Sequence, residues 1–350
     1  MQFVKTAVVI LNWNTADYLR RFIPPLLKSC AGLDAQVIVV DSASTDASPD
    51  VLREEFPGVR TILLEENFGF TGGYNRALAG IDAEYFVLLN SDVEVPETWL
   101  TPLVGWLDAH PDCAVAGPVF HALLPEGRSD SFEYAGAAGG LLDRYGYPFC
   151  RGRVPGRMAV DEGQYGTPKD VMWVSGACLV TRACVWKKLG GFDGRFFAHM
   201  EEIDYCWRAQ LAGWKVTVVP ESVVYHIGGG TLPQTSRFKL KLNYRNNLLL
   251  LDANLAATIG YGAACRRIFI RKILDGGAAL VYLLSGRVDC FRAVLDAHRE
   301  YRELRRQAAG LRDDRTEARV HGILPVRILL QTALRGEKIF NYLTRYEDSY

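Results

Sequence analysis

Thr6-Ala-Val-Val-Ile-Leu-Asn-Trp-Asn14 is an apolar, β-branched run that ends in polar residues. Such a run predicts a strand that is buried on both faces, as in a parallel sheet. Three more runs of the same character precede residue 100: Gln36–Val40, Val59–Leu64 and Tyr85–Leu89. Helical patterns lie between the runs, at about 15–30, 45–55 and 71–81. This alternation predicts an α/β fold with a doubly wound, mainly parallel sheet.

Polar clusters follow the predicted strands. They are Asn12-Trp13-Asn14, Asp41-Ser42, Glu65–Asn75 and Asn90-Ser91-Asp92. In open α/β sheets, ligands bind outside the carboxyl ends of the strands. Any one of these clusters could be an ordinary turn before a helix. Four of them at the same edge of the sheet predict a binding crevice.

The residue types in these clusters favour a phosphate-bearing ligand. Asn90 and Asp92 point the same way at a strand end, and a carboxylate there could hold a hard divalent cation against phosphate oxygens. Gly69, Gly72 and Gly73 precede a helix and would let its backbone amides approach an anion. The glycines match neither the Walker pattern nor Gly-x-Gly-x-x-Gly.

Composition excludes wholesale disorder, because 49% of the 350 residues are apolar and 23% are charged. The balance of 40 basic and 40 acidic residues conceals an uneven distribution. Residues 1–230 hold 19 basic and 28 acidic side chains, whereas 231–350 hold 21 and 12. The asymmetry indicates either an anionic partner for the C-terminal part or attraction between the two parts.

The eight cysteines show no zinc-binding spacing, and several lie in apolar surroundings, so we expect buried free thiols in a reducing cytoplasm. The first residues show no secretory signal pattern. The longest uncharged apolar stretches, Ala253–Cys265 and Gly276–Gly286, are shorter than the ~18–20 residues that span a bilayer.

Beyond residue 100 the alternation of strands and helices gives way first to a loop-rich segment and then to a helical region. A helix at 97–109 and strands at Val171–Val180 and Lys215–Val219 are predicted, with long substrate-proximal loops over the Gly-, Pro- and Arg-rich segment 118–170. From about residue 231 the pattern is helical, at Phe238–Leu251, Ile268–Leu284 and Phe291–Ala308.

Eight motifs in order resemble a known family. They are Val8–Asn14, Val39–Asp46, Asn67–Asn75, Leu88–Val95, Ser175–Cys178, Gly190–Asp193, Phe196–Arg208 and His226–Thr231. This set resembles inverting family 2 glycosyltransferases of the Rossmann-like GT-A fold, in the branch that includes bacterial rhamnosyltransferases, and it covers about residues 6–230. The resemblance implies a nucleotide-sugar-binding half at 1–100, an acceptor-binding and catalytic half at 101–230, and a basic helical extension at 231–350.

The resemblance also implies roles for individual residues. Asp92 matches the second aspartate of the family's Asp-x-Asp metal motif, with Asn90 in place of the first, and His226 matches a histidine that completes the metal site in some members. The implied cofactor is Mg²⁺ or Mn²⁺. Asp41 resembles the aspartate that bonds the nucleotide base. The implied nucleotide-sugar site consists of Asn12, Asn14, Asp41, Ser42, Asn67, Gly69, Gly72, Gly73, Asn75, Asn90 and Ser91.

Glu201-Glu202-Ile203-Asp204 could be an ordinary acidic helix start, stabilised by the helix dipole. The family, however, places its general base in a Glu-Asp pair here. Glu202 aligns with the base, so this chain has Glu where Asp is usual, and Glu201 is the second candidate. Trp173, Phe197 and Asp204 are assigned to the acceptor side, although burial of the two aromatic residues in the core is an alternative.

The predicted activity is metal-dependent transfer of a sugar from a nucleoside diphosphate to a hydroxyl of a saccharide or lipid-linked acceptor, in assembly of bacterial surface polysaccharide. Deoxythymidine-diphosphate rhamnose is the donor that the branch implies, and a uridine-diphosphate sugar is the alternative. Two other functions remain open: a sugar-nucleotide nucleotidyltransferase and a non-catalytic nucleotide-sugar-binding scaffold. A nucleic-acid binder is disfavoured, because the basic residues lie in helices with large apolar faces.

The basic C-terminal region predicts a peripheral membrane surface at the inner face of the cell membrane. Arg266, Arg267, Arg271 and Lys272 flank the apolar Ile268-Phe269-Ile270. Apolar side chains beside cations are typical of helices that lie on anionic lipid. Packing of the region against the acidic part of the chain is the alternative.

Overall fold

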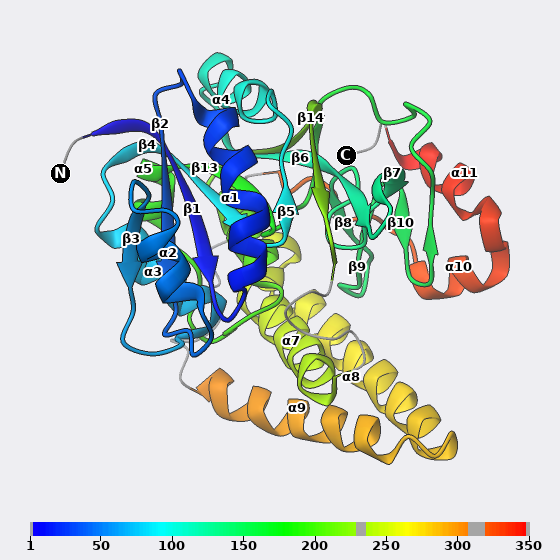
Figure 1. The fold of residues 1–350 in the computed structure, drawn as a ribbon. Coiled ribbons are helices and arrows are strands. Elements are labelled where there is room, and N and C mark those ends of the chain that lie inside the picture. The colour runs from blue at the N-terminus through cyan, green and yellow to red at the C-terminus, as the bar shows by residue number, and fades with distance from the viewer. Residues whose placement is uncertain (1–2, 229–235, 307–318, 348–350) are drawn as a thin grey trace.

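The computed structural model describes residues 3–228, 236–306 and 319–347 (Figure 1). A large mixed sheet runs through its centre, in the order β12-β14-β6-β13-β4-β1-β2-β3. The N-terminal strands β1 (Val4–Asn12), β2 (Ala35–Asp41), β3 (Arg60–Leu63) and β4 (Ala83–Asn90) pair in parallel, which confirms the predicted strands and their direction.

The helices between these strands also lie where the sequence predicts them. They are α1 (Ala16–Cys30), α2 (Ser48–Glu54) and α3 (Gly69–Ala79), and α4 (Leu100–Ala109) follows β4 within the predicted range 97–109. The central strands are fully buried: Val8, Val9, Val39 and Val40 are 0% exposed. Their burial on both faces explains why they read as continuous apolar runs.

The segment 118–170 is not the set of long loops predicted above. It contains much of β6 (Cys113–Leu124), then β7 (Gly127–Phe132) and β12 (Lys169–Asp170) of the large sheet. A small antiparallel sheet lies between them, formed by β8 (Gly140–Leu142), β9 (Pro148–Cys150), β10 (Arg153–Val154) and β11 (Arg157–Met158). The glycines that suggested loops make its tight turns, since Gly146, Gly152 and Gly156 all have positive φ.

The prediction of a strand at Val171–Val180 is wrong over most of that range. Only β13 (Cys178–Arg182) is a strand of the large sheet, where it pairs antiparallel with β4 and β6. The preceding residues are buried because they cross to the small sheet: Met172 N donates to Gly140 O at 2.9 Å, and Gly140 N donates to Trp173 O at 2.8 Å. The other prediction, Lys215–Val219, is the start of the longer β14 (Lys215–His226), which pairs in parallel with β6. The short β5 (Val93–Glu94) pairs with the end of β14.

Two helices connect β13 to β14: α5 (Ala183–Leu189) and α6 (Glu201–Leu211). The three long predicted helices of the C-terminal region are α7 (Arg237–Ile259), α8 (Tyr261–Leu284) and α9 (Val288–Arg306), which lie together on one side of the sheet (Figure 1). The last two residues of the predicted helix Phe291–Ala308 are outside the described residues. The chain then adds a bridge between Ile323 and Leu142 and the helices α10 (Ile328–Arg335) and α11 (Ile339–Leu343) beside the small sheet.

All eight cysteines are free. Cys30, Cys113, Cys150, Cys178 and Cys206 are buried as expected, whereas Cys184 and Cys265 are exposed and Cys290 is half-buried. Across the residues that the structure describes, no helix is both long and apolar enough to cross a membrane.

Candidate active site

A cavity of about 870 Å³ opens at the carboxyl ends of the central strands. Its walls come from the strand ends after β1, β2 and β4, the starts of α3 and α6, the end of β14, the small sheet with its preceding loop, and the facing sides of α7 and α8. The site residues predicted above that line it are Ser42, Asn67, Gly69, Asn90, Ser91, Asp92, Trp173, Phe197, Glu201, Glu202 and His226. The crevice expected from the polar strand ends therefore exists.

Asn12, Asn14 and Asp41 do not line the cavity; they brace the loops behind its wall. The buried Asn12 donates from Nδ2 to Asp41 Oδ2 at 2.7 Å. Asp41 Oδ1 in turn accepts from Ser44 N at 2.8 Å. Asn14, with a positive φ of 55°, accepts from Thr45 N at 2.7 Å. These contacts fix the two strand ends from which Trp13 and Ser42 reach the cavity.

The three glycines that the sequence assigns to one ligand have different roles in the structure. Gly69 lines the cavity with a φ of +71°, and a Cβ there would lie 2.5 Å from the Phe197 ring. Gly73 faces β1, where a Cβ would lie 2.7 Å from Leu11. Gly72 faces Phe68 at the same distance of 2.7 Å. Gly72 and Gly73 therefore serve helix packing, and their placement in the ligand site is not supported.

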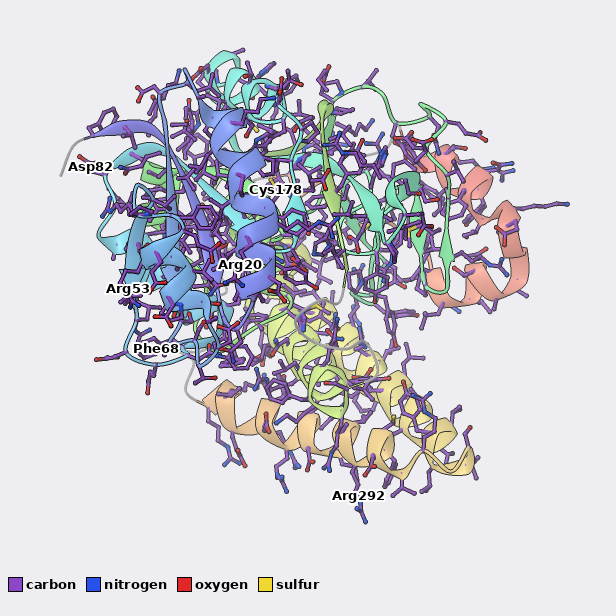
Figure 2. The ribbon with its side chains drawn as sticks, in the orientation of Figure 1. Arg20, Arg53, Phe68, Asp82, Cys178 and Arg292 are labelled. Carbon is purple, nitrogen blue, oxygen red and sulfur yellow. The ribbon has the colours of Figure 1, made fainter. Side chains whose placement is uncertain are left out.

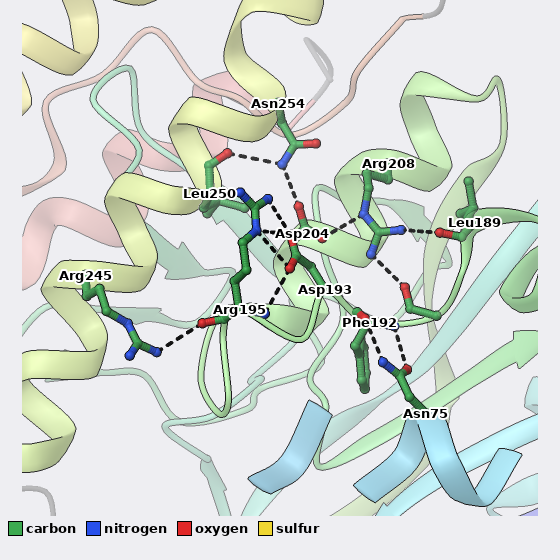
Figure 3. Close-up of polar contacts among 11 residues, drawn as sticks. Asn75, Leu189, Phe192, Asp193, Arg195, Asp204, Arg208, Arg245, Leu250 and Asn254 are labelled. Atoms are coloured by element: carbon green, nitrogen blue, oxygen red, sulfur yellow. Dashed lines mark hydrogen bonds and ion pairs between the residues drawn. The ribbon is translucent and has the colours of Figure 1, made fainter. Parts of the chain in front are cut away.

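Asn75 and Asp204 do not line the cavity either, and both have partners elsewhere in the protein (Figure 3). Asn75 Oδ1 accepts from Phe192 N at 2.9 Å and its Nδ2 donates to Phe192 O at 2.8 Å. Asp204 is 1% exposed and accepts from Arg208 Nε at 2.7 Å and Asn254 Nδ2 at 2.8 Å. The acceptor-side role expected for Asp204 is replaced by a structural one, joining α6 to α7.

Replacing Asp204 with alanine should lower the free energy of unfolding by about 2 kcal/mol, because it leaves a mostly buried guanidinium and a buried amide without their carboxylate. Chemical denaturation followed by circular dichroism measures this loss. Asp296→Ala is a matched control, since Asp296 pairs with the exposed Arg237 at 2.8 Å and should cost less than about 1 kcal/mol. Equal losses in the two variants would contradict the structural role of Asp204.

Asp92 and His226 meet on the floor of the cavity. They are 4% and 5% exposed, and Asp92 Oδ1 lies 3.2 Å from His226 Nε2. On the other side of the imidazole, Glu133 Oε2 lies 3.1 Å from Nδ1. Burial opposes protonation of His226, but the hydrogen bonds and charges of the two carboxylates outweigh it and raise its pKa to about 10.

Asp92 and His226 fit a divalent cation that also binds phosphate, on condition that the cation displaces the proton that the raised pKa keeps on His226. Within the described ranges, no three or more His, Cys, Asp or Glu side chains are placed to hold a metal ion by themselves. Mg²⁺ and its analogues are commonly held by one or two protein ligands, with substrate phosphates supplying further oxygens. A metal-binding histidine usually directs its second nitrogen to a carboxylate. Glu133 lies at ion-pair distance from His226 Nδ1, although Nδ1 makes no hydrogen bond of standard geometry with any residue that the structure describes.

Glu201 and Glu202 enter the cavity from a strained turn. Phe197, His199 and Met200, which precede α6, all have φ between 64° and 74°. Such φ values cost free energy in non-glycine residues and persist only where surrounding contacts impose them. Here α7 provides the contacts: Asn246 Nδ2 donates to the carbonyls of Phe196, Ala198 and His199 at 2.7–3.0 Å.

Both glutamates have carboxyl oxygens in a buried environment and raised pKa values. Glu201 Oε2 and Glu202 Oε2 are buried and have no hydrogen-bond partner among the described residues. Burial raises the pKa of Glu202 to about 7. Burial, reinforced by the charge of Glu202, also raises the pKa of Glu201 well above its ordinary value. A carboxyl with a pKa near neutrality is suited to act as a general base.

The two predicted acceptor-side aromatics differ in accessibility. Phe197 is 38% exposed and its ring meets Phe238 of α7 edge to face at 6.2 Å. Trp173 is 4% exposed, and its Nε1 donates to Leu141 O at 3.2 Å. The indole therefore belongs largely to the core, while the Phe197 ring is accessible from the cavity.

Sequence reasoning missed several cavity residues. Glu133 carries no motif and reaches His226 only through the pairing of β14 with β6 and of β6 with β7. The C-terminal helices contribute others: Phe238, Lys239, Asn243, Tyr244 and Asn247 from α7 and Arg271 from α8. One signal was available in the sequence, because two asparagines, Asn246 and Asn247, stand directly before the apolar run Leu248–Leu251. In the structure both asparagines are 0% exposed.

The mainly parallel sheet with a cavity at its carboxyl edge is the architecture of the GT-A fold. Two solved structures share the fold. GalNAc-T7, solved with UDP, GalNAc and Mn²⁺, has a TM-score of 0.54 and 17% identity over 69% of this chain and 47% of that one. A mannosyltransferase from Pyrobaculum calidifontis, solved with GDP-Man and Mn²⁺, has a TM-score of 0.53 and 14% identity over 99% of this chain and 85% of that one.

Residues 7–131 match the family described as Glycosyl transferase family 2. An N-acetylglucosaminyl-diphospho-decaprenol L-rhamnosyltransferase of Mycobacterium tuberculosis is 27% identical over 63% of this chain and 75% of its own length. The O-antigen biosynthesis protein RfbC of Myxococcus xanthus is 26% identical over 63% of this chain but only 17% of its own length. Residues 7–131 therefore form a family 2 glycosyltransferase domain, and the family resemblance seen in the sequence is confirmed.

Proposed function

We propose that the protein transfers a sugar, with rhamnose the first candidate, from a nucleoside diphosphate to a hydroxyl of a saccharide or lipid-linked acceptor in assembly of a bacterial surface polysaccharide. One observation carries the proposal: the Glu202 carboxyl, whose Oε2 has no hydrogen-bond partner among the described residues, lines the same cavity as the Asp92–His226 pair. The named activities of the rhamnosyltransferase and O-antigen relatives support the choice of sugar and pathway class.

The donor is proposed to bind at the strand ends of residues 1–100. Ser42, Asn67, Gly69, Asn90 and Ser91 would contact the nucleotide sugar, with Asn12 and Asp41 fixing the loops behind them. Asp92 and His226 would hold a divalent metal, which would supply positive charge against the diphosphate as it leaves. Glu133 would orient the His226 ring through Nδ1.

The acceptor is proposed to enter from the side formed by residues 101–230 and α7. Its hydroxyl oxygen attacks the anomeric carbon as the bond from that carbon to the diphosphate oxygen breaks. Glu202 accepts the hydroxyl proton during the attack, which makes the oxygen a competent nucleophile. Attack opposite the leaving diphosphate inverts the anomeric centre without a covalent enzyme intermediate. Phe197 is the aromatic placed to stack on the acceptor ring.

Turnover should depend on pH through Glu202. Only its carboxylate accepts a proton, so the rate should rise about tenfold per pH unit in acid and level off above its pKa of about 7. Initial rates of nucleoside diphosphate release at saturating substrates measure the profile, with circular dichroism at each pH as the folding control. A rate that stays constant from about pH 5 to 8 in folded enzyme would contradict this role.

The donor itself is best found by a thermal-shift panel of nucleotide sugars, with and without Mn²⁺. A donor that binds the folded protein raises its melting temperature in proportion to the logarithm of concentration over dissociation constant. A nucleoside triphosphate stabilising the protein more than any nucleotide sugar would favour the nucleotidyltransferase. Tight donor binding without turnover on any acceptor would favour the scaffold.

We propose that the acceptor is met at a membrane surface, with the C-terminal region 231–350 as the contact. The patch predicted from sequence needs revision: Ile268 is 7% exposed, and Arg271 is 4% exposed with Asp275 as its partner at 2.8 Å. The alternative was that the positive charges of the C-terminal region pair with the acidic residues of 1–230. For α7 this is not the main arrangement. Arg237 and Lys241 pair with Asp296 and Glu300 of α9 instead.

A further inference from the structure

The outward face of α8 is apolar and exposed over most of the helix. Phe269, Ile273, Leu280, Val281 and Leu284 are between 53% and 79% exposed, and Ile270, Leu274 and Leu283 are between 37% and 41% exposed. Spacings of three and four residues place most of them on one side of the helix. No described residue covers this face. A patch of this kind on a soluble protein marks a contact surface.

This apolar face contains no exposed charge. Between Phe269 and Leu284 the charged residues are Arg271, Lys272 and Asp275. Arg271 and Asp275 are buried and paired with each other, and the half-buried Lys272 lies over the Tyr301 ring of α9 at 4.8 Å. All three therefore point into the protein, and the exposed side of α8 is left to aliphatic and aromatic groups.

Basic residues stand at both ends of the apolar face. Arg266 is exposed at the start of α8, and Arg287 is exposed in the turn that follows it. Arg292 of α9 is also exposed and points away from the molecule (Figure 2). One acidic residue, Asp289, lies at this second end. Long basic side chains at the margins of an apolar face can reach phosphate groups while the face is buried in lipid.

These charges favour a bilayer over a second copy of the chain. A two-fold pair of α8 helices would place Arg266 opposite Arg287 if antiparallel, or each of them opposite itself if parallel. Like charges then meet at both ends, which opposes association. An anionic lipid surface neutralises both ends at once.

The inward face of the same helix reaches the active-site cavity. Arg271, which lines the cavity, stacks over the Tyr147 ring at 3.8 Å. Tyr147, directly before β9, and Tyr244 of α7 also line the cavity. α8 therefore has an apolar side turned to solvent and a polar side turned to the cavity. A lipid-linked acceptor could keep its tail in the bilayer and still present its sugar to Glu202.

We propose that α8 docks on an anionic bilayer through its outward face and so brings the acceptor side of the cavity to lipid-borne substrate. The second part rests on the proposed glycosyl transfer, whereas the docking itself does not. The test is co-sedimentation of the full chain with phosphatidylcholine vesicles, with and without phosphatidylglycerol. The protein should bind the mixed vesicles, and high salt should weaken binding.

Ile273→Glu and Leu280→Glu should each weaken vesicle binding about tenfold or more, because each places a charge where an aliphatic group meets lipid. Leu334→Glu is the matched control: Leu334 is 72% exposed on α10, away from α8, and its replacement should change nothing. All three variants should keep the wild-type melting temperature and donor-induced thermal shift, which separates lost docking from misfolding.

Vesicle binding equal in the wild type and both α8 variants would overturn the proposal. So would a wild type that stays in the supernatant with the mixed vesicles. Light scattering that shows a dimer, converted to monomer by Ile273→Glu, would assign the face to a second copy instead. None of these outcomes involves turnover, so the proposed glycosyl transfer stands or falls separately on the Glu202 variants.

Discussion

Replacing Glu202 with glutamine is expected to lower turnover by about 10²- to 10⁴-fold while donor affinity stays within about twofold. The amide keeps the size of the side chain but cannot accept a proton from the acceptor hydroxyl. Nucleoside diphosphate release measures the loss, and calorimetry with a donor or its nucleoside diphosphate measures binding. The combination distinguishes a lost base from a lost binding contact.

Glu201→Gln is the matched control, because its carboxyl is adjacent and buried and its Oε2 also has no hydrogen-bond partner among the described residues. A small effect at Glu201 with a large one at Glu202 would identify the base as Glu202. A larger effect at Glu201 would reverse the assignment. Normal turnover in both variants would remove the pair from the mechanism.

Glu202→Gln should also change the melting temperature of the protein. Burial raises the pKa of Glu202 from 4.5 to about 7, so folding favours the protonated acid. Protonated Glu202 therefore stabilises the fold fully below its pKa in the unfolded chain, and this stabilisation is lost as pH rises through its pKa in the folded protein. Above about pH 7, therefore, the buried carboxylate costs stability that glutamine does not. Glu202→Gln should melt above the wild type in mild alkali, and the difference should vanish in acid.

Asp92→Ala should weaken nucleoside diphosphate binding by about 10²-fold in the presence of Mn²⁺ and much less in its absence. The proposed reason is that Asp92 supplies the carboxylate oxygen of a two-ligand site and that His226 alone cannot replace it. Calorimetry in buffers with Mn²⁺ and with chelator separates the two cases.

Asp161→Ala is the control for Asp92→Ala. Asp161 Oδ2 also pairs with a histidine, His121 Nε2, at 2.9 Å, but neither residue lines the cavity. Its loss should leave nucleotide binding unchanged. An equal loss for Asp92→Ala with and without Mn²⁺ would mean that Asp92 serves only as a partner for His226.

The periodicity of apolar residues predicted the strands and helices that form from residues close together in the chain. β1 to β4, their parallel order and the helices between them follow from apolar runs and turn residues within a few positions of each other. Apart from β6, the strands of 118–170 were missed because they are two to six residues long and separated by glycine turns. Such strands form only when the neighbouring chain is in place.

The sequence by itself determined the family, the edge of the sheet that carries the site, and the placement of Asp92, His226, Glu201 and Glu202 in one cavity. Tertiary structure alone decided that Asn75 and Asp204 turn inward, because their partners Phe192 and Asn254 are distant in the chain. It also brought Glu133 to His226 and directed Arg271 inward while Phe269 faces solvent. The physical reason is that a sequence pattern reports which side chains share a face, whereas long-range packing decides what that face meets.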